Sequence, residues 1–348
     1  NHSGSVALLS WNVAGRTEIS LFDTKDQKQL RTLEMPVELI GGLEFSSDDR
    51  YLVFSGSGAT EPSNIWRYDF EKNTFTKLTE SPHPGINLNE LITPKLVEFK
   101  SFDGLELSGW LYEPTSGKKP YPTVISYHGG PEGQARPSFN YTFQALLSQG
   151  IVVFDPNVRG SSGFGKRFLN LDNGALRVNG VKDIEACYNY IVESGFAEKS
   201  SVGIMGGSYG GYMVMAGITE YPEMFAAAAN LFGVVNFITF FEQTEPWMAA
   251  ISKIEYGDPD TEADMLKSLS PINKVDLAKS PTIVLHGAND TNVPVVEAEQ
   301  VVESLKQRNV PVEYILFPDE GHGWRKTPNK VTSTVSIVNW FKKYLTEE

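Results

Sequence analysis

The sequence contains little of what several protein classes require. Cys187 is its only cysteine, which excludes an intrachain disulfide and a cysteine-rich metal site, and we expect neither a metal nor another cofactor. No stretch approaches the ~20 apolar residues of a membrane span, so we expect no membrane partner. The 30 basic residues are outnumbered by 43 acidic ones, and the resulting net charge of −13 argues against a nucleic-acid partner.

A targeting signal is also missing. The chain begins with Asn1 instead of methionine, and no signal-peptide pattern follows. We therefore expect a fragment or a processed form of a longer protein, located in the cytoplasm. The 348 residues suffice for one large domain with a small one, or for two comparable domains.

Residues 1–93 have the pattern of short β-strands separated by turns. Two similar segments, Leu21–Asp23 and Arg67–Asp69, begin 46 residues apart (67 − 21), a period that suits four-stranded propeller blades. Because two blades cannot close a propeller, we expect this small all-β region to resemble the last blades of a longer β-propeller. A small β cap is the alternative.

Residues 94–348 show a different pattern, in which apolar strands alternate with helices after a hairpin around Asp103-Gly104. This alternation predicts an α/β domain with a mostly parallel, doubly wound sheet and functional residues at the carboxyl ends of its strands. The expected strands are Thr123–Tyr127, Ile151–Phe154, Val202–Met205, Ala226–Ala229, Thr282–His286 and Glu313–Phe317. The expected helices are Phe139–Ser148, Val181–Glu193, Tyr209–Thr219, Val295–Arg308 and Val335–Leu345.

One strand-to-helix junction carries a serine between glycines. Ser208 has Gly206 two residues before it and Gly210 two residues after it. At such an elbow the serine is held in a strained backbone conformation with its hydroxyl exposed, and side chains at the two glycines would collide. A chance match is the alternative, but the surrounding strand and helix favour Ser208 as a nucleophile.

A nucleophilic serine needs a base, and the base needs an acid that orients it. His322 follows the last expected strand between two glycines, whereas His128 and His286 precede the place expected for the base. For the acid we favour Asp290, because a carboxylate two or three residues from His322 in its own loop is poorly placed to hold the ring. The order Ser208, Asp290, His322 is that of the α/β-hydrolases.

The reaction also needs hydrogen-bond donors for the oxyanion. We expect the N–H of Tyr209, directly after the serine, and the N–H of Gly130 in the loop after an earlier strand. His128 could instead orient that loop. Arg159 is expected to anchor the loop after its own strand.

Five motifs together resemble the prolyl oligopeptidase family of serine peptidases, particularly its acylaminoacyl-peptidase branch. They span residues 95–348 and are His128–Pro131, Asn157–Ser161, Gly206–Tyr212, Asp290–Val293 and Gly321-His322. The resemblance implies an α/β-hydrolase domain covered by a β-propeller that restricts entry to peptides, with short peptides as substrates. It also implies an acyl-enzyme at Ser208, with His322 as base and Asp290 as the residue that orients it.

The resemblance further implies the binding residues. Asn292 would bind a peptide carbonyl of the substrate, and the residue before the scissile bond, expected to be apolar, would lie in a pocket. The pocket walls would be Tyr209, Val234, Phe237, Phe240 and Val293. Relatives that hold the oxyanion with a tyrosine side chain have His128 at that place here, so we expect an oxyanion hole of backbone groups alone.

Three functions remain open on these residues. The leading one is a serine peptidase for short peptides, and the second is a carboxylesterase on the same fold, whose oxyanion loop often reads His-Gly-Gly-Gly where this chain has Pro131. The third, a non-catalytic binding protein, is disfavoured because all three triad residues are present. An incomplete propeller could expose apolar surface, which allows a homo-oligomer.

Overall fold

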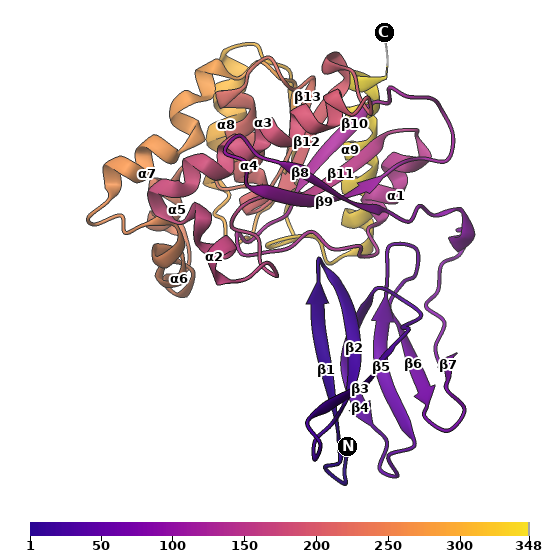
Figure 1. Ribbon diagram of the computed structural model, residues 1–348. Coiled ribbons are helices and arrows are strands. Elements are labelled where there is room, and N and C mark those ends of the chain that lie inside the picture. The colour runs from indigo at the N-terminus through magenta and orange to yellow at the C-terminus, as the bar shows by residue number, and fades with distance from the viewer. Residues whose placement is uncertain (347–348) are drawn as a thin grey trace. The chain divides into compact units, whose positions relative to one another are not determined.

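The computed structural model describes residues 1–346, which form two compact units. One unit comprises residues 1–95 and 136–144, and the other comprises residues 96–135 and those from 145 onward (Figure 1). Among the described helices, none combines the length and the apolar character needed to cross a membrane.

The first unit consists of two antiparallel sheets. Similar segments of the sequence, Leu21–Asp23 and Arg67–Asp69, lie in the last but one strand of their respective sheets. Side chains from both sheets, including Ile19, Leu21 and Phe54, form one buried cluster. The three-stranded sheet contains β1 (Val6–Val13), β2 (Arg16–Asp23) and β3 (Lys28–Leu33); the four-stranded sheet contains β4 (Leu39–Phe45), β5 (Tyr51–Ser57), β6 (Asn64–Asp69) and β7 (Thr74–Lys77).

The second unit is built on an eight-stranded sheet in the order β15-β14-β13-β12-β10-β11-β9-β8. Strands β10 to β15 pair in parallel, and β9 is antiparallel to β11, so the sheet is mostly parallel as predicted. The strands are β8 (Lys95–Lys100), β9 (Glu106–Tyr112), β10 (Thr123–Tyr127), β11 (Val152–Asn157), β12 (Val202–Gly207), β13 (Ala227–Leu231), β14 (Thr282–Gly287) and β15 (Val312–Phe317).

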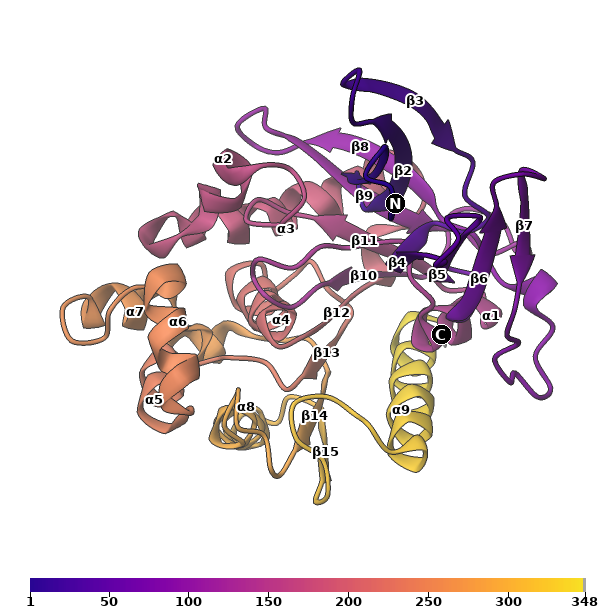
Figure 2. The same ribbon diagram turned by 90° about the horizontal axis from the view of Figure 1, so that it is seen from below.

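Helices cover both faces of this sheet. Figure 2 shows α3, α4 and α8 on one face and α9 on the other. The helices are α1 (Tyr141–Ser148), α2 (Lys166–Leu169), α3 (Arg177–Glu193), α4 (Tyr209–Glu220), α5 (Phe237–Gln243), α6 (Pro246–Tyr256), α7 (Ala263–Leu269), α8 (Val296–Gln307) and α9 (Thr327–Leu345).

Two parts of the helix prediction were wrong. Helix α9 begins at Thr327, eight residues before the predicted start at Val335, and Pro328 occupies its first turn, where the missing N–H is not needed. The short helix α2 was not predicted, and neither were helices α5, α6 and α7, which lie between β13 and β14. Helix α6 has exposed apolar residues as well as buried ones, so its sequence does not reveal a single core-facing side.

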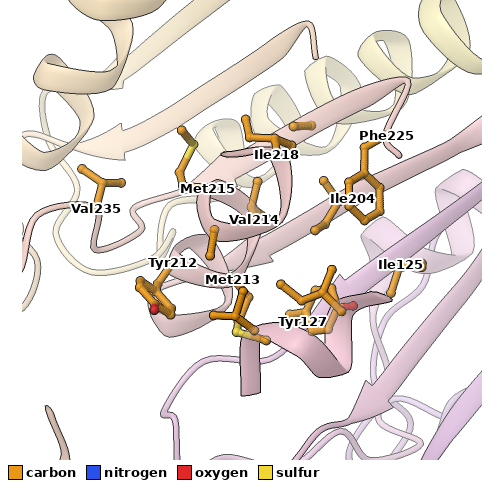
Figure 3. Packing of buried hydrophobic residues seen from close by; sticks show 14 of the residues in the cluster. Ile125, Tyr127, Ile204, Tyr212, Met213, Val214, Met215, Ile218, Phe225 and Val235 are labelled. Carbon is orange, nitrogen blue, oxygen red and sulfur yellow. The ribbon is translucent and has the colours of Figure 1, made fainter. Parts of the chain in front are cut away.

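Helix α4 is the centre of the core. It is buried from Tyr209 to Thr219, and its side chains Tyr212, Met213 and Val214 lie among those of the central strands (Figure 3). A helix that is apolar on all sides is stable only inside a protein. The central strands are likewise buried on both faces, as parallel strands between helix layers are. Ser208, which directly precedes this helix, is therefore attached to a buried and tightly packed element.

Candidate active site

Ser208 lies between the end of β12 and the start of α4, in a sharp turn. Its backbone has φ +58° and ψ −121°, a region that residues other than glycine rarely adopt. A Cβ at Gly206 would lie 2.4 Å from the carbonyl oxygen of Gly210, and one at Gly210 would lie 2.0 Å from that of Tyr127. Only glycine fits at both positions, and in the second case the neighbouring strand β10 is the obstacle.

The structure brings the three predicted triad residues together. The Nε2 atom of His322 lies 3.0 Å from Oγ of Ser208, and Nδ1 of His322 lies 2.8 Å from Oδ2 of Asp290. These distances join a hydroxyl, an imidazole and a carboxylate in one hydrogen-bonded chain. Such a chain can move a proton from the hydroxyl to the ring while the carboxylate holds the ring in place.

Asp290 is fixed by the loop after β14. Its side chain is fully buried, and Oδ1 accepts the backbone N–H groups of Asn292 and Val293, both at 2.9 Å. These bonds leave Oδ2 directed at His322. His286, at the end of the same strand, is buried with Nε2 2.9 Å from the carbonyl oxygen of Val293; burial lowers the pKa of this ring. His286 therefore holds the Asp290 loop.

The loop after β15 carries His322 and is fixed from both sides. The buried carboxylate of Glu320 accepts the N–H groups of Arg325 and Lys326, at 3.1 and 2.9 Å. The ring of Phe232 packs edge-on against the imidazole of His322 with centroids 4.8 Å apart. Phe232 was not predicted, although its position directly after β13 places it at the same sheet edge as the triad. Its ring thus supports one side of the imidazole that contacts Ser208.

The expected oxyanion donors lie beside Ser208. The N–H of Tyr209 opens α4 and that of Gly130 belongs to the loop after β10; neither has an acceptor among the described residues. Gly130 lines the same cavity as Ser208 and has φ +136°, a conformation that favours glycine. His128 lies 2.8 Å from the carbonyl oxygen of Gly129 and from Oγ of Ser161, so its ring holds the loop.

A cavity of about 520 Å³ opens beside Ser208 and His322. Its walls include Val234, Phe240, Asn292 and Val293 of the predicted binding residues. The complete lining is Gly130, Pro131, Glu132, Gly133, Ser208, Val234, Phe240, Met248, Ile251, Ser252, Ile254, Glu255, Tyr256, Asn292, Val293 and His322.

Two predicted wall residues lie behind the cavity. The ring of Phe237 is fully buried and packs against Tyr212 and Tyr256, with centroids 5.3 and 4.8 Å away. The side chain of Tyr209 is also buried, and its hydroxyl donates to Asp172 over 3.2 Å. Residues of helix α6, which the sequence analysis missed, line the cavity in place of these two side chains.

Helix α6 contributes Met248, Ile251 and Glu255 to the cavity. A signal for this helix exists in the sequence, because Glu245-Pro246 is a typical helix start with proline in the first turn. Trp247, Ile251 and Ile254 follow at helical spacing, but they are exposed, so the spacing alone does not show which side faces the cavity.

Arg159 anchors its loop as predicted. Its side chain is 3% exposed and donates to both carboxylate oxygens of Asp183, at 2.9 Å each. A second pair of bonds reaches Asp103 in the β8–β9 hairpin. The guanidinium thus ties the loop after β11 to helix α3 and to the hairpin, and it does not line the cavity.

Comparison with known proteins identifies the family. Residues 137–348, more than half of the chain, match the prolyl oligopeptidase family. The sequence is 36% identical over 297 residues to dipeptidyl aminopeptidase BIII of Pseudoxanthomonas mexicana, covering 81% of this chain and 43% of the relative. It is 28% identical over 304 residues to the human acylamino-acid-releasing enzyme, covering 84% of this chain and 40% of the relative.

Solved structures agree with this comparison. A puromycin-hydrolyzing peptidase of Mycobacterium tuberculosis superposes with a TM-score of 0.89 at 26% identity, covering 99% of this chain and 54% of the other. The acylaminoacyl peptidase of Pyrococcus horikoshii superposes with a TM-score of 0.85 at 23% identity, over 98% of this chain and 55% of the other. The latter likeness concerns the fold alone.

Fold and comparisons together define an α/β-hydrolase domain preceded by an all-β N-terminal region, which confirms the predicted fold class. The chain belongs to the prolyl oligopeptidase family. It spans less than half of the length of the curated relatives described above.

Proposed function

We propose that this chain hydrolyses short peptides as an acylaminoacyl-peptidase or oligopeptidase, through an acyl-enzyme at Ser208. The observation that carries the proposal is the hydrogen-bonded chain from Ser208 through His322 to Asp290 at the mouth of the cavity. Both the family membership and the peptidase names of the relatives support a peptide bond as the target.

The proposed mechanism has two halves. In the first, His322 takes the hydroxyl proton of Ser208 while Oγ attacks the substrate carbonyl, and the N–H groups of Tyr209 and Gly130 receive the oxyanion. His322 then gives its proton to the leaving amine as the C–N bond breaks. In the second half, His322 takes a proton from water, the resulting hydroxide attacks the ester, and the proton returns to Ser208. Asp290 orients the ring throughout.

The cavity beside Ser208 receives the side chain of the residue before the cut. Its walls Val234, Phe240 and Val293 are apolar. Asn292, which lines the same cavity, would donate its side-chain amide to a peptide carbonyl of the substrate. We further propose that residues 1–93 are the partial β-propeller and residues 94–348 the peptidase domain. Two small antiparallel sheets in the first unit support this assignment.

Matched chromogenic substrates test the proposal. We expect turnover of N-acetyl-amino-acid p-nitroanilides and of free dipeptide p-nitroanilides, and the preferred amino terminus distinguishes the two types of peptidase. Ser208→Ala removes the nucleophile and should lower kcat by at least ~10⁴-fold without a change in the circular dichroism spectrum. Turnover of simple esters with no turnover of either amide would favour the carboxylesterase.

The cytoplasmic location and a homo-oligomer stay predictions. Fractionation of cells with an antibody against the chain tests the first. Sedimentation velocity of the purified protein at several concentrations tests the second, since a homo-oligomer gives a sedimentation coefficient above that of the 38.5 kDa chain.

A further inference from the structure

Glu255 is a carboxylate on an otherwise largely apolar cavity wall. It lies near the end of α6, and the side chain is 11% exposed. Its Oε1 atom accepts from Nη2 of Arg177 at 2.7 Å. Its second oxygen, Oε2, has no hydrogen-bond donor among the described residues and is not closed off from solvent. Because Glu255 lines the cavity, a ligand there can contact this residue.

The charge of Glu255 is not cancelled by its buried partner. Arg177 is fully buried between the rings of Tyr209 and Tyr256 and also binds Asp172 at 2.6 Å. One guanidinium therefore serves two carboxylates. Burial raises the pKa of Asp172 to about 6. The guanidinium binds the two carboxylates through different nitrogens, Nη1 for Asp172 and Nη2 for Glu255.

The other described residues that line the cavity add negative charge and no positive side chain. Glu132 is the second carboxylate on the cavity wall, and no lysine or arginine occurs among the described lining residues. A carboxylate that shares one guanidinium with a second carboxylate, at the edge of a low-dielectric cavity, attracts a cation more strongly than the same group in water. The cavity therefore favours a positively charged group over a neutral one of the same shape.

The apolar part of the cavity indicates how that cation is carried. Met248, Ile251 and Phe240 line the same space as Glu255. Lysine and arginine side chains place their aliphatic stems along apolar surface while the charged end reaches a polar partner. A long cationic side chain thus matches both parts of the cavity, whereas a wholly apolar residue would leave the carboxylate without a partner.

We propose that Glu255 selects a lysine or arginine as the residue before the scissile bond, by binding the cationic nitrogens of its side chain through Oε2. This inference rests on the proposed peptidase function. It replaces the expectation from the sequence that the residue before the scissile bond is apolar. The alternative source of a cation is the free amino terminus of a dipeptide, and the experiment separates the two.

The first test compares arginine with citrulline, which has nearly the same shape and no charge. We expect kcat/KM for N-acetyl-Gly-Arg-p-nitroanilide to exceed that for the citrulline substrate by about tenfold or more. Glu255→Gln keeps an acceptor for Arg177 but loses the charge, so it should reduce the ratio of the two kcat/KM values to about one. Glu242→Gln, the same change at an exposed position of α5 outside the cavity lining, should keep the wild-type ratio.

The acetyl group removes the amino-terminal cation from these substrates. Equal rates for arginine and citrulline would therefore overturn the proposal. The same two substrates without the acetyl group test the amino terminus. A rate that rises when the amino terminus is free, but is the same for arginine and citrulline, would also overturn the proposal. An unchanged ratio in Glu255→Gln would overturn the role of this residue.

A binding experiment separates this inference from the proposed function. Calorimetry with the Ser208→Ala protein measures the affinities of N-acetyl-Gly-Arg and N-acetyl-Gly-citrulline without any turnover. We expect arginine to bind about tenfold more tightly, and Ser208→Ala/Glu255→Gln to bind both equally. Equal affinities in Ser208→Ala would overturn the inference even if peptides are hydrolysed. Lack of amide turnover by the wild type would overturn the function even if arginine binds more tightly.

Discussion

The reacting side of the site, formed by Ser208, Asp290 and His322, differs from its pocket side, formed by α6 and the loop after β13. The reacting residues follow the ends of parallel strands and are held mainly by backbone hydrogen bonds, such as those to Asp290. The pocket side lies on helices outside the sheet and depends on packing between side chains distant in sequence. In the proposed function, the first side carries out the reaction, and the second selects the peptide that undergoes it.

This difference explains what family membership can teach about the chain. The reacting residues lie in the short motifs that carry the resemblance to the family. The pocket side contains Met248, Ile251 and Glu255, which belong to none of the five motifs. Knowledge of the family therefore carries over to the chemistry sooner than to the substrate, and changes on the two sides should have different kinetic consequences.

The largest effect is expected on the reacting side. Asp290→Asn keeps the size of the side chain but gives His322 the wrong hydrogen-bond partner, so kcat should fall by about 10⁴-fold while KM changes little. The kinetics of a p-nitroanilide substrate measure both constants. Asp319→Asn is the matched control: Asp319 lies closer to His322 in sequence but binds Asn329 and Lys326, and its change should leave kcat within about twofold. Equal losses in both variants would contradict the assignment.

A smaller effect concerns stability on the pocket side. Glu297 is buried, accepts the N–H groups of Val235 and Asn236 at 2.8 and 2.7 Å, and so holds the loop that carries Val234. Burial raises its pKa from 4.5 to about 7. The folded chain thus keeps a proton that the unfolded chain loses between these values, and the free energy of unfolding should fall by roughly 3 kcal/mol as the pH rises from 4.5 to 7.

Glu297→Gln cannot titrate, so this contribution to the pH dependence should disappear. Urea unfolding at pH 5, 6 and 7 measures the slope in the wild type and in the variant. Glu299→Gln changes an exposed carboxylate of the same helix and should keep the wild-type slope. If Glu297→Gln had that slope as well, the buried carboxylate would not be its source.

The smallest effect is expected where the pocket wall is most open. Ile251 lines the cavity but is 56% exposed, so Ile251→Ala removes only part of an apolar contact. We expect kcat/KM for substrates with long side chains to fall about fivefold with little change in stability. Trp247→Ala, on the same helix at 54% exposure but outside the lining, should leave kcat/KM unchanged. Equal effects of the two changes would mean that general properties of α6, and not the cavity wall, set the rate.

The same comparison explains how much the sequence predicts. The elbow at Ser208 and the order of the triad follow from local rules, because the ends of parallel strands meet at one edge of a sheet. The six strands of the α/β region from β10 to β15 were therefore predicted to within a few residues. The need for glycine at position 210 was predicted, but the predicted reason was a collision across the turn. In the structure, a side chain there would instead collide with the backbone of Tyr127 in the neighbouring strand.

The pocket could not be predicted in the same way. Phe237 and Phe240 lie three residues apart on α5, yet only Phe240 reaches the cavity, while Phe237 packs against Tyr256 of α6. Which aromatic ring lines the cavity depends on where α6 packs, and no local pattern contains that information. Glu255 was missed for the same reason, because its role depends on Arg177, which is 78 residues earlier in the chain.

Labelling with a fluorophosphonate tests the central claim most directly, because the reagent reacts with a serine that an adjacent base activates. After proteolysis, mass spectrometry identifies the modified peptide. The account predicts one label, on Ser208, and none in Ser208→Ala. A label on another residue, or none on the folded wild-type protein, would contradict the account.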